Sequence, residues 1–329
     1  MDLLEIKDLT THFFTRSGVI RAVDNLSLSL QKNRVLGLVG ESGCGKTVTA
    51  LSVLNLVPYP GKIVSGSIFF EGRDLLSLEP REMRNIRGAK ISMIFQEPMT
   101  ALNPVFTVGN QIAEVLITHL NVTKKQAMDS AVELLHSVGI PSPEKRVHEY
   151  PHQMSGGMRQ RVMIAMAIAC RPSLILADEP TTALDVTIQA HILELLSQIQ
   201  QEMGMAMILV THDLGLIAER AHDVAVMYAG RIVEQAETAE LFANPMHPYT
   251  RGLIDSIPKP GEARKTRLRT IAGTVPRLHD LPAGCTFVER CEVKSKRCEA
   301  EPALVEVKVG HLVRCWKAEE DQAPNLKTR

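Results

Sequence analysis

The segment Gly40-Glu41-Ser42-Gly43-Cys44-Gly45-Lys46-Thr47 is the most informative part of the chain. It fits the pattern G-x-x-x-x-G-K-[ST], which is typical of loops that bind phosphate groups. A short apolar strand is predicted before it, over Arg34–Val39, and a helix rich in Ala and Leu after it, over Val48–Val57. Glycines allow backbone N–H groups to point at phosphate oxygens, and a helix N-terminus adds partial positive charge. The segment therefore predicts a nucleotide-binding loop in which Lys46 contacts the β- and γ-phosphates and Thr47 holds Mg²⁺.

Composition limits the class of protein. The 329 residues are enough for one large domain and a smaller one, and 45% of them are hydrophobic. Lys plus Arg and Asp plus Glu balance at 37 each, so the charge gives no support to a nucleic-acid binder. No apolar run approaches the roughly 18 residues of a membrane span, and the acidic N-terminus is not typical of a secretory signal. We expect a cytoplasmic chain whose membrane role, if it has one, comes through a partner.

Strand-like runs alternate with helical patterns along most of the chain, which predicts an α/β fold with a mainly parallel sheet. The stretch from Val105 to about Tyr150 has helical spacing and no good strand, so we expect a helical insert. The strands are predicted at Leu3–Ile6, Leu26–Leu30, Val35–Val39, Ser67–Phe70, Ile91–Phe95, Leu174–Ala177, Met207–Val210 and Val224–Tyr228.

Two acidic residues follow the apolar strand Leu174–Ala177. A buried strand that brings a carboxylate to its C-terminal edge suits Mg²⁺ binding beside a phosphate loop. Asp178 is the candidate Mg²⁺ ligand, and Glu179 is the candidate general base that activates water. By itself such a pair is as typical of an exposed acidic turn, but the phosphate loop favours the catalytic interpretation.

Three further signals are weaker when taken alone. Ser155 is a candidate N-cap of a helix, and Gly156 and Gly157 permit close approach to an anion. His212 follows a strand and either senses the γ-phosphate or is an ordinary surface residue. Gln96 also follows a strand, and it either contacts Mg²⁺ or the attacking water or belongs to an ordinary loop.

The order of these motifs resembles that of the ABC (ATP-binding-cassette) ATPases over roughly residues 1–260. The resemblance implies a P-loop ATPase core with an antiparallel β part and a helical subdomain. The family's signature LSGGQ is here Met154-Ser-Gly-Gly-Met158, so Ser155 and Gly157 are retained and the Gln is not. The motifs in chain order are the phosphate loop Gly40–Thr47, Gln96, Ser155–Met158, Asp178–Glu179, Ala183-Leu184-Asp185 and His212.

This resemblance implies a site shared between two subunits that pair head to tail, with each ATP held between one phosphate loop and the partner's signature. It also implies that adenine stacks on an aromatic ring near the N-terminus, with Phe13 as the first candidate and Phe14 as the second. The residues that it places in cis on one nucleotide are Lys46, Thr47, Gln96, Asp178, Glu179 and His212. Those that it places at the partner's nucleotide are Ser155, Gly156 and Gly157, with Asp185 as a further nucleotide-site residue.

Several segments are similar to the peptide and nickel importer branch of the family, particularly to bacterial dipeptide and oligopeptide permease ATPases. They are Ile94–Pro104, Tyr150–Gln153, Ala221–Gly230, His247–Thr250, Gly273–Pro276 and Gly284–Cys285. The resemblance now covers nearly the whole chain. It implies an energy-coupling ATPase on the cytoplasmic face of the bacterial membrane. Its implied partners are a second ABC ATPase subunit, preferably a different one, two membrane permeases and an extracytoplasmic peptide-binding protein, with no nucleic acid.

Two alternatives to a peptide importer stay open at this point. One is an importer ATPase of the same branch for nickel or another small solute. The other is a soluble ABC ATPase that acts outside transport. The second is less favoured, because the sequence holds one cassette and no sustained heptads between Lys46 and Asp178.

The alternation of strand and helix patterns ends near residue 255, and Pro258, Pro260 and Gly261 then indicate a linker. We therefore predict a nucleotide-binding domain over residues 1–255, with a helical subdomain at about 105–170. A C-terminal extension over residues 256–329 follows.

Four of the six cysteines gather in this extension, at Cys285, Cys291, Cys298 and Cys315. Their spacing, C-x5-C-x6-C-x16-C, lacks the C-x2-C pairs of zinc ribbons and ferredoxins. Four thiolates suffice for Zn²⁺ or for a 4Fe–4S cluster, and spacing alone does not choose between them. The family resemblance implies the 4Fe–4S cluster, with Zn²⁺ or a plain packing role as alternatives.

Overall fold

The first sheet of the molecule is antiparallel and four-stranded, in the order β2-β1-β4-β5. Its strands are β1 (Leu4–Thr15), β2 (Gly18–Leu30), β4 (Gly61–Phe70) and β5 (Arg73–Asp74). Leu4 is paired with Leu30 on one side and with Phe70 on the other. The first three strands are much longer than predicted, because their outer halves carry polar and half-exposed residues that hide the apolar signal.

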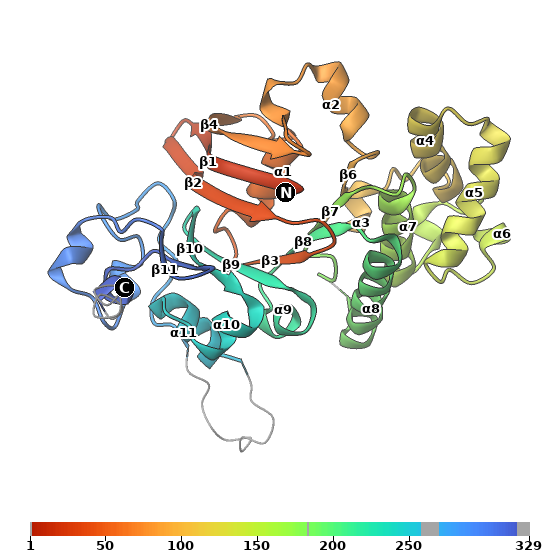
Figure 1. Cartoon of the computed structure of the whole chain (residues 1–329). Coiled ribbons are helices and arrows are strands. Elements are labelled where there is room, and N and C mark those ends of the chain that lie inside the picture. The colour runs from red at the N-terminus through yellow and green to blue at the C-terminus, as the bar shows by residue number, and fades with distance from the viewer. Residues whose placement is uncertain (1, 183, 258–269, 321–329) are drawn as a thin grey trace. The chain divides into compact units, whose positions relative to one another are not determined.

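The structure is a computed structural model, shown in Figure 1, and it describes residues 2–182, 184–257 and 270–320. The chain divides into two units. Unit 1 comprises residues 1–30, 34–76 and 210–329, and unit 2 comprises residues 31–33 and 77–209. Ala183 and the predicted linker residues Pro258, Pro260 and Gly261 lie outside the described residues. The domain boundary at residue 255 stays a prediction.

A second set of strands in unit 1 runs in the order β11-β12-β10-β9-β3. These strands are β3 (Val35–Val39), β9 (Asp223–Tyr228), β10 (Arg231–Glu237), β11 (Val305–Lys308) and β12 (His311–Val313). Only β3 and β9 pair in parallel here, while β9–β10, β10–β12 and β11–β12 are antiparallel. Residues near the C-terminus therefore extend the sheet that carries the phosphate loop.

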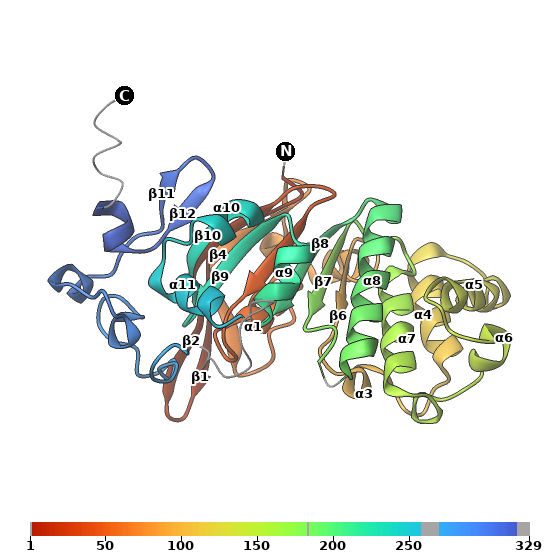
Figure 2. The ribbon, with the colours of Figure 1, turned by 90° about the horizontal axis from the view of Figure 1, so that it is seen from below.

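The helices of unit 1 are α1 (Lys46–Val53), α9 (Leu214–Arg220), α10 (Thr238–Ala243) and α11 (Pro248–Asp255). Short 3-10 turns lie at Leu75–Ser77, Val288–Arg290 and Lys296–Glu299. In Figure 2, α9, α10 and α11 lie along the strands β9 and β10. Helix α1 begins two residues earlier than predicted and ends four residues earlier. It ends there because Asn55 takes a left-handed conformation, with φ of 49°.

Unit 2 holds the strands β6 (Ile91–Ile94), β7 (Leu174–Asp178) and most of β8 (Ala206–Thr211), in the order β8-β7-β6. Strands β6 and β7 pair in parallel, and every residue of the three strands is buried. Such burial on both faces explains why these segments are continuous apolar runs without alternation.

Helices fill the rest of unit 2. They are α2 (Pro80–Ile86), α3 (Pro98–Ala101), α4 (Val108–Leu120), α5 (Lys124–Ser137), α6 (Pro143–Arg146), α7 (Gly156–Ile168) and α8 (Val186–Met203), with a 3-10 turn at Pro151–Gln153. Thr107 and Thr123 cap α4 and α5, each accepting a backbone hydrogen bond. The four helices α4 to α7 gather together in Figure 1. The predicted α/β class, with an antiparallel part and a helical part, is confirmed.

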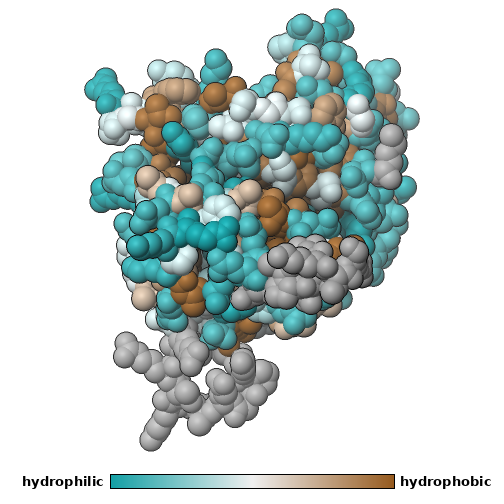
Figure 3. Space-filling view, turned by 60° about the vertical axis from the view of Figure 1, so that its left-hand side comes forward, coloured by the Kyte–Doolittle hydropathy of each residue, from teal (hydrophilic) through white to brown (hydrophobic). Residues whose placement is uncertain are grey.

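The surface fits this architecture. Hydrophilic residues predominate over the face seen in Figure 3, and hydrophobic residues lie there in small groups. Within the described residues, no helix combines the length and the apolar character that crossing a bilayer requires.

Candidate functional site

The phosphate loop joins β3 to the N-terminus of α1 in unit 1. Gly45 is the N-cap of α1 in a left-handed conformation, with φ of 107°. A Cβ atom at Gly45 would collide with the carbonyl oxygen of Ala22, and one at Gly40 with that of Met227. Both positions therefore require glycine, because the backbone of neighbouring strands approaches too closely for a side chain.

Lys46 is buried, with 5% of its surface exposed, and its ammonium lies inside the loop. The Nζ atom donates to the carbonyl oxygens of Gly40, at 2.7 Å, and Glu41, at 3.1 Å. The neighbouring Cys44 is fully buried, and this burial raises the pKa of its thiol, so it packs as a neutral side chain. The loop thus holds one buried cation at the N-terminus of α1, and both the cation and the helix N-terminus favour a polyanion.

The carboxyl ends of β6 and β7 bring two predicted catalytic residues together in unit 2. Ile94 and Ala177 are paired across these parallel strands, so the residues that follow them emerge at one edge. The amide of Gln96 donates to Glu179 Oε2 at 3.1 Å, and the hydroxyl of Thr182 donates to the same oxygen at 2.9 Å. Both hydrogen bonds orient the Glu179 carboxylate.

Glu179 also has an unusual backbone, with φ of 42°. A left-handed conformation is uncommon for a residue other than glycine, and such conformations gather at functional sites. Asp178, which ends β7, is only 1% exposed. The Asp178 carboxylate is therefore buried, and the Glu179 carboxylate is held by two hydrogen bonds. Their roles as metal ligand and general base stay predictions.

The predicted signature opens α7, as the sequence indicated. Ser155 is exposed and caps the helix, with its hydroxyl accepting from the backbone N–H of Met158 at 3.4 Å. Gly157 is buried against α8, where a Cβ would lie 2.9 Å from a methyl group of Ile188. The helix N-terminus therefore presents a hydroxyl and a bare backbone to solvent, and both are suited to phosphate oxygens.

Two further predicted residues lie at the end of a strand or the start of a helix. Asp185 caps α8 by accepting from the backbone N–H of Ile188 at 3.0 Å. His212 directly follows β8 and is exposed. Their contacts with nucleotide stay predictions. The predicted residues of unit 1 are Phe13, Gly40–Thr47 and His212, and those of unit 2 are Gln96, Ser155, Gly156, Gly157, Asp178, Glu179 and Asp185.

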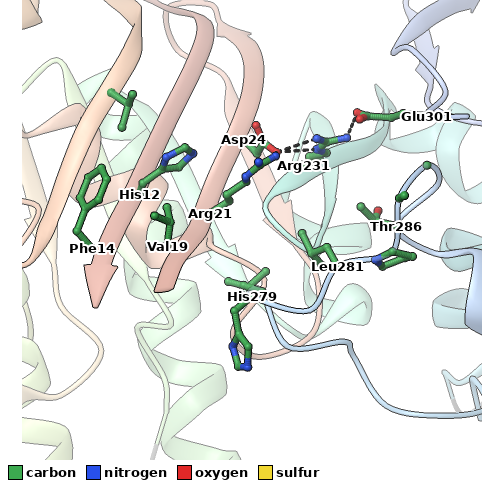
Figure 4. A pocket seen from close by; sticks show the side chains of 15 residues that line it. His12, Phe14, Val19, Arg21, Asp24, Arg231, His279, Leu281, Thr286 and Glu301 are labelled. Atoms are coloured by element: carbon green, nitrogen blue, oxygen red, sulfur yellow. Dashed lines mark hydrogen bonds and ion pairs between the residues drawn. The ribbon is translucent and has the colours of Figure 1, made fainter. Parts of the chain in front are cut away.

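The two candidate aromatic residues differ in their surroundings. Phe14 is 51% exposed and lines a cavity of about 710 Å³, with His12 edge-on to its ring. Figure 4 shows this cavity, in which Arg231 forms ion pairs with Asp24 and Glu301. Phe13 pairs with Gly61 of β4 and lies outside that lining. Which ring stacks on adenine stays a prediction.

The four clustered cysteines are free and half-buried. Burial is the main cause that raises the pKa of Cys285 to about 11, and the neighbouring Cys298, Cys315 and Cys291 contribute to the same rise. The backbone N–H of Cys285 also donates to the carbonyl of Cys298 at 3.0 Å. Across the described ranges, no three His, Cys, Asp or Glu side chains are grouped so as to hold one metal ion.

Sequence reasoning missed the residues that surround Glu41 in the phosphate loop. The backbone N–H of Glu41 donates to the hydroxyl of Tyr249 at 2.9 Å, and Arg290 binds its carboxylate. Phe287 completes an aromatic group with Tyr228 and Tyr249. Tyr228 and Tyr249 lie in segments that carry the family resemblance. Nothing in the sequence links them or Arg290 to Glu41, because the hydrogen bonds to Glu41 join segments about 200 or more positions apart.

Unit 1 holds a strand, a phosphate loop and a helix, and unit 2 holds a strand that ends at Asp178 and is followed by Glu179. These features define a P-loop nucleoside triphosphatase. Residues 23–182 match the family model described as "ABC transporter", and residues 233–298 match "Oligopeptide/dipeptide transporter, C-terminal region". The chain belongs to the ABC transporter family, as an ATPase of that family.

Individual relatives agree with this assignment. The dipeptide transport ATP-binding protein DppD of Escherichia coli is 49% identical over 96% of each chain. The oligopeptide transport ATP-binding protein AppD of Bacillus subtilis is 50% identical over 98% of each chain. Among solved structures, the dimeric ATP-binding cassette MJ0796 bound to ADP and Pi is similar, with a TM-score of 0.65 and 26% identity. That likeness covers 71% of this chain and 98% of the other.

Proposed function

We propose that this chain is the energy-coupling ATPase subunit of a bacterial importer for dipeptides or oligopeptides. The observation that carries the proposal is the match of residues 233–298 to the C-terminal region of oligopeptide and dipeptide transporters. This region contains most of β10, and its Arg290 binds Glu41 of the phosphate loop, so part of the region lies beside the proposed nucleotide site. Relatives named for dipeptide and oligopeptide transport support the same substrate class.

In the proposed mechanism, two ATPase subunits close on ATP head to tail. Lys46 and the loop N–H groups bind the phosphates. Thr47 and Asp178 would hold the Mg²⁺ that accompanies ATP, and this ion would supply positive charge to the phosphate oxygens. Glu179, oriented by Gln96, takes a proton from the attacking water. His212 contacts the γ-phosphate, and the partner's copy of the signature Ser155–Gly157 completes the site.

In this role, the chain lies on the cytoplasmic face of the cell membrane. It is held there by two permease subunits, which receive peptide from an extracytoplasmic binding protein. A second ABC ATPase subunit, preferably a different chain, supplies the other half of the dimer. Import of nickel or another small solute by the same machinery is the second candidate, because that branch shares these motifs.

Deleting the gene for this chain is expected to reduce uptake of a radiolabelled dipeptide or oligopeptide to background in the source bacterium. Supplying the intact gene should restore uptake, whereas the Glu179→Gln form should not. Radiolabelled nickel is the matched control substrate. Loss of nickel uptake with normal peptide uptake would transfer the assignment to the second candidate, and normal uptake of both would contradict an importer role.

We also propose that Cys285, Cys291, Cys298 and Cys315 hold a 4Fe–4S cluster. The donor set fits, because four free thiol side chains lie in one module between residues 285 and 315, and cysteine thiolates are the ligands of a 4Fe–4S cluster. The resemblance of the chain to dipeptide permease ATPases favours the cluster over Zn²⁺, which four thiolates could also bind.

Protein purified without oxygen is expected to be brown, with an absorbance band at about 400 nm and about four irons per chain. Replacing any of the four clustered cysteines by Ser should remove most of the iron and the colour. Cys170→Ser is the matched control, since Cys170 lies in unit 2, outside the module, and should keep both. Zinc in place of iron would support the alternative, and a metal-free protein would contradict both.

A further inference from the structure

Arg290 links the C-terminal extension to the phosphate loop. Its guanidinium donates to Glu41 through two hydrogen bonds, at 2.6 Å and 3.0 Å. Its Nε donates to the carbonyl of Ala272 at 3.0 Å. The side chain of Arg290 is only 4% exposed, while that of Glu41 is 31% exposed. A bidentate pair with one partner this buried is stronger and better defined than a surface ion pair.

Aromatic rings hold the guanidinium in place. It lies 5.8 Å from the centre of the Tyr228 ring and 5.9 Å from that of Phe287. Phe287 is 3% exposed and packs edge-on against Tyr228. Arg290 therefore has little freedom to leave Glu41, and the pair is a fixed feature of the loop.

The position of Glu41 makes this pair relevant to nucleotide binding. Glu41 is the second residue of the phosphate loop, and its carbonyl oxygen accepts a hydrogen bond from Lys46 Nζ. An uncompensated carboxylate beside a loop that binds a polyanion repels the ligand and attracts the lysine away from it. The structure contains a positive charge placed to prevent this.

We propose that Arg290 is a positioning residue for nucleotide binding, because it neutralises and orients Glu41 so that the phosphate loop accepts ATP. The proposal rests on the assignment of Gly40–Thr47 as the phosphate site, and it is independent of the solute that is transported. Arg290 touches no nucleotide in this scheme and acts through Glu41. The extension thereby tunes ATP affinity from a segment that lies between Cys285 and Cys291.

The test uses full-length protein and measures the dissociation constants of Mg-ADP and of a non-hydrolysable Mg-ATP analogue by calorimetry. Arg290→Gln, which keeps most of the side-chain stem, is expected to weaken binding of the ATP analogue about tenfold. The loss should be smaller for ADP, which carries less charge, and it should shrink as salt is raised. Arg290→Lys should recover part of the affinity.

Replacing Glu41, the other member of the ion pair, is expected to change the affinity for ATP in the opposite direction. Glu41→Gln removes the repulsive carboxylate and is expected to bind the ATP analogue more tightly than the unaltered chain does. Adding Glu41→Gln to Arg290→Gln should return affinity to within about twofold of the starting value. A purely structural role for the pair predicts instead that both single changes weaken binding.

The matched control is Arg297→Gln. Arg297 lies in the same extension and stacks on Trp316, 4.4 Å from the ring centre, with an ion pair to Glu320. It should leave nucleotide affinity unchanged. Thermal unfolding of each variant reports folding, and Glu41→Gln still tests the proposal if Arg290→Gln does not fold.

Two outcomes would overturn the inference and are distinct from failure of the phosphate-site assignment. Equal affinity of Arg290→Gln and the unaltered chain would overturn it, as would equal losses in Arg290→Gln and Glu41→Gln. Absence of nucleotide binding by the unaltered chain would instead reject the phosphate site itself.

Discussion

Glu179→Gln is expected to lower the rate of ATP hydrolysis by roughly 10²–10⁴, while ATP binding is preserved. The amide has the size of the carboxylate and can keep a hydrogen bond to Thr182, so the local structure should persist. It cannot accept a proton from water, so general-base catalysis is lost. The left-handed backbone at Glu179 is unchanged by this substitution, which isolates the chemistry from the conformation.

Hydrolysis should be measured on the chain assembled with its ATPase partner and permeases, since the site is proposed to be shared. Binding of radiolabelled ATP to the same preparation gives the second readout. Glu133→Gln, at an exposed position on α5, is the control and should change neither quantity. A near-normal rate in Glu179→Gln would remove it as the base, and loss of ATP binding would indicate a structural role instead.

The features that could be predicted from the sequence are those that depend on residues close together in the chain. A phosphate loop needs glycine where a Cβ would strike neighbouring backbone, so Gly40 and Gly45 are fixed by geometry and visible as a motif. Strand β7 is buried on both faces and is therefore a continuous apolar run. Its position beside β6 then brings Gln96 to Glu179 without any further signal being needed.

The features that escaped prediction depend on long-range pairing. Strands β11 and β12 are short, and β11 carries two charged residues, so the pairing of β11 with β12 and of β12 with β10 is not visible locally. The ends of β1 and β2 contain half-exposed positions that break the expected alternation. The pair Arg290–Glu41 spans 249 positions, and neither residue stands in a pattern that points to the other.

Lys46→Ala is expected to weaken ATP binding by roughly 10–100-fold, because a buried charge-assisted contact contributes about 1.5–3 kcal/mol. The Lys46 ammonium is held by two carbonyl oxygens of the loop, so it is already positioned where phosphate oxygens would lie. Lys46→Arg should also bind weakly, since its larger planar head does not fit between these carbonyls. Affinity for a fluorescent ATP analogue measures both variants.

Lys32→Ala, at an exposed position before β3, is the control and should bind ATP normally. Melting temperatures separate the loss of a contact with the nucleotide from the loss of the fold. The expected pattern is the reverse of that for Glu179→Gln, which keeps the nucleotide and loses turnover. If Lys46→Ala kept full affinity while Glu179→Gln lost it, nucleotide binding would depend on the strand end in unit 2, and the phosphate loop would have to be assigned another ligand.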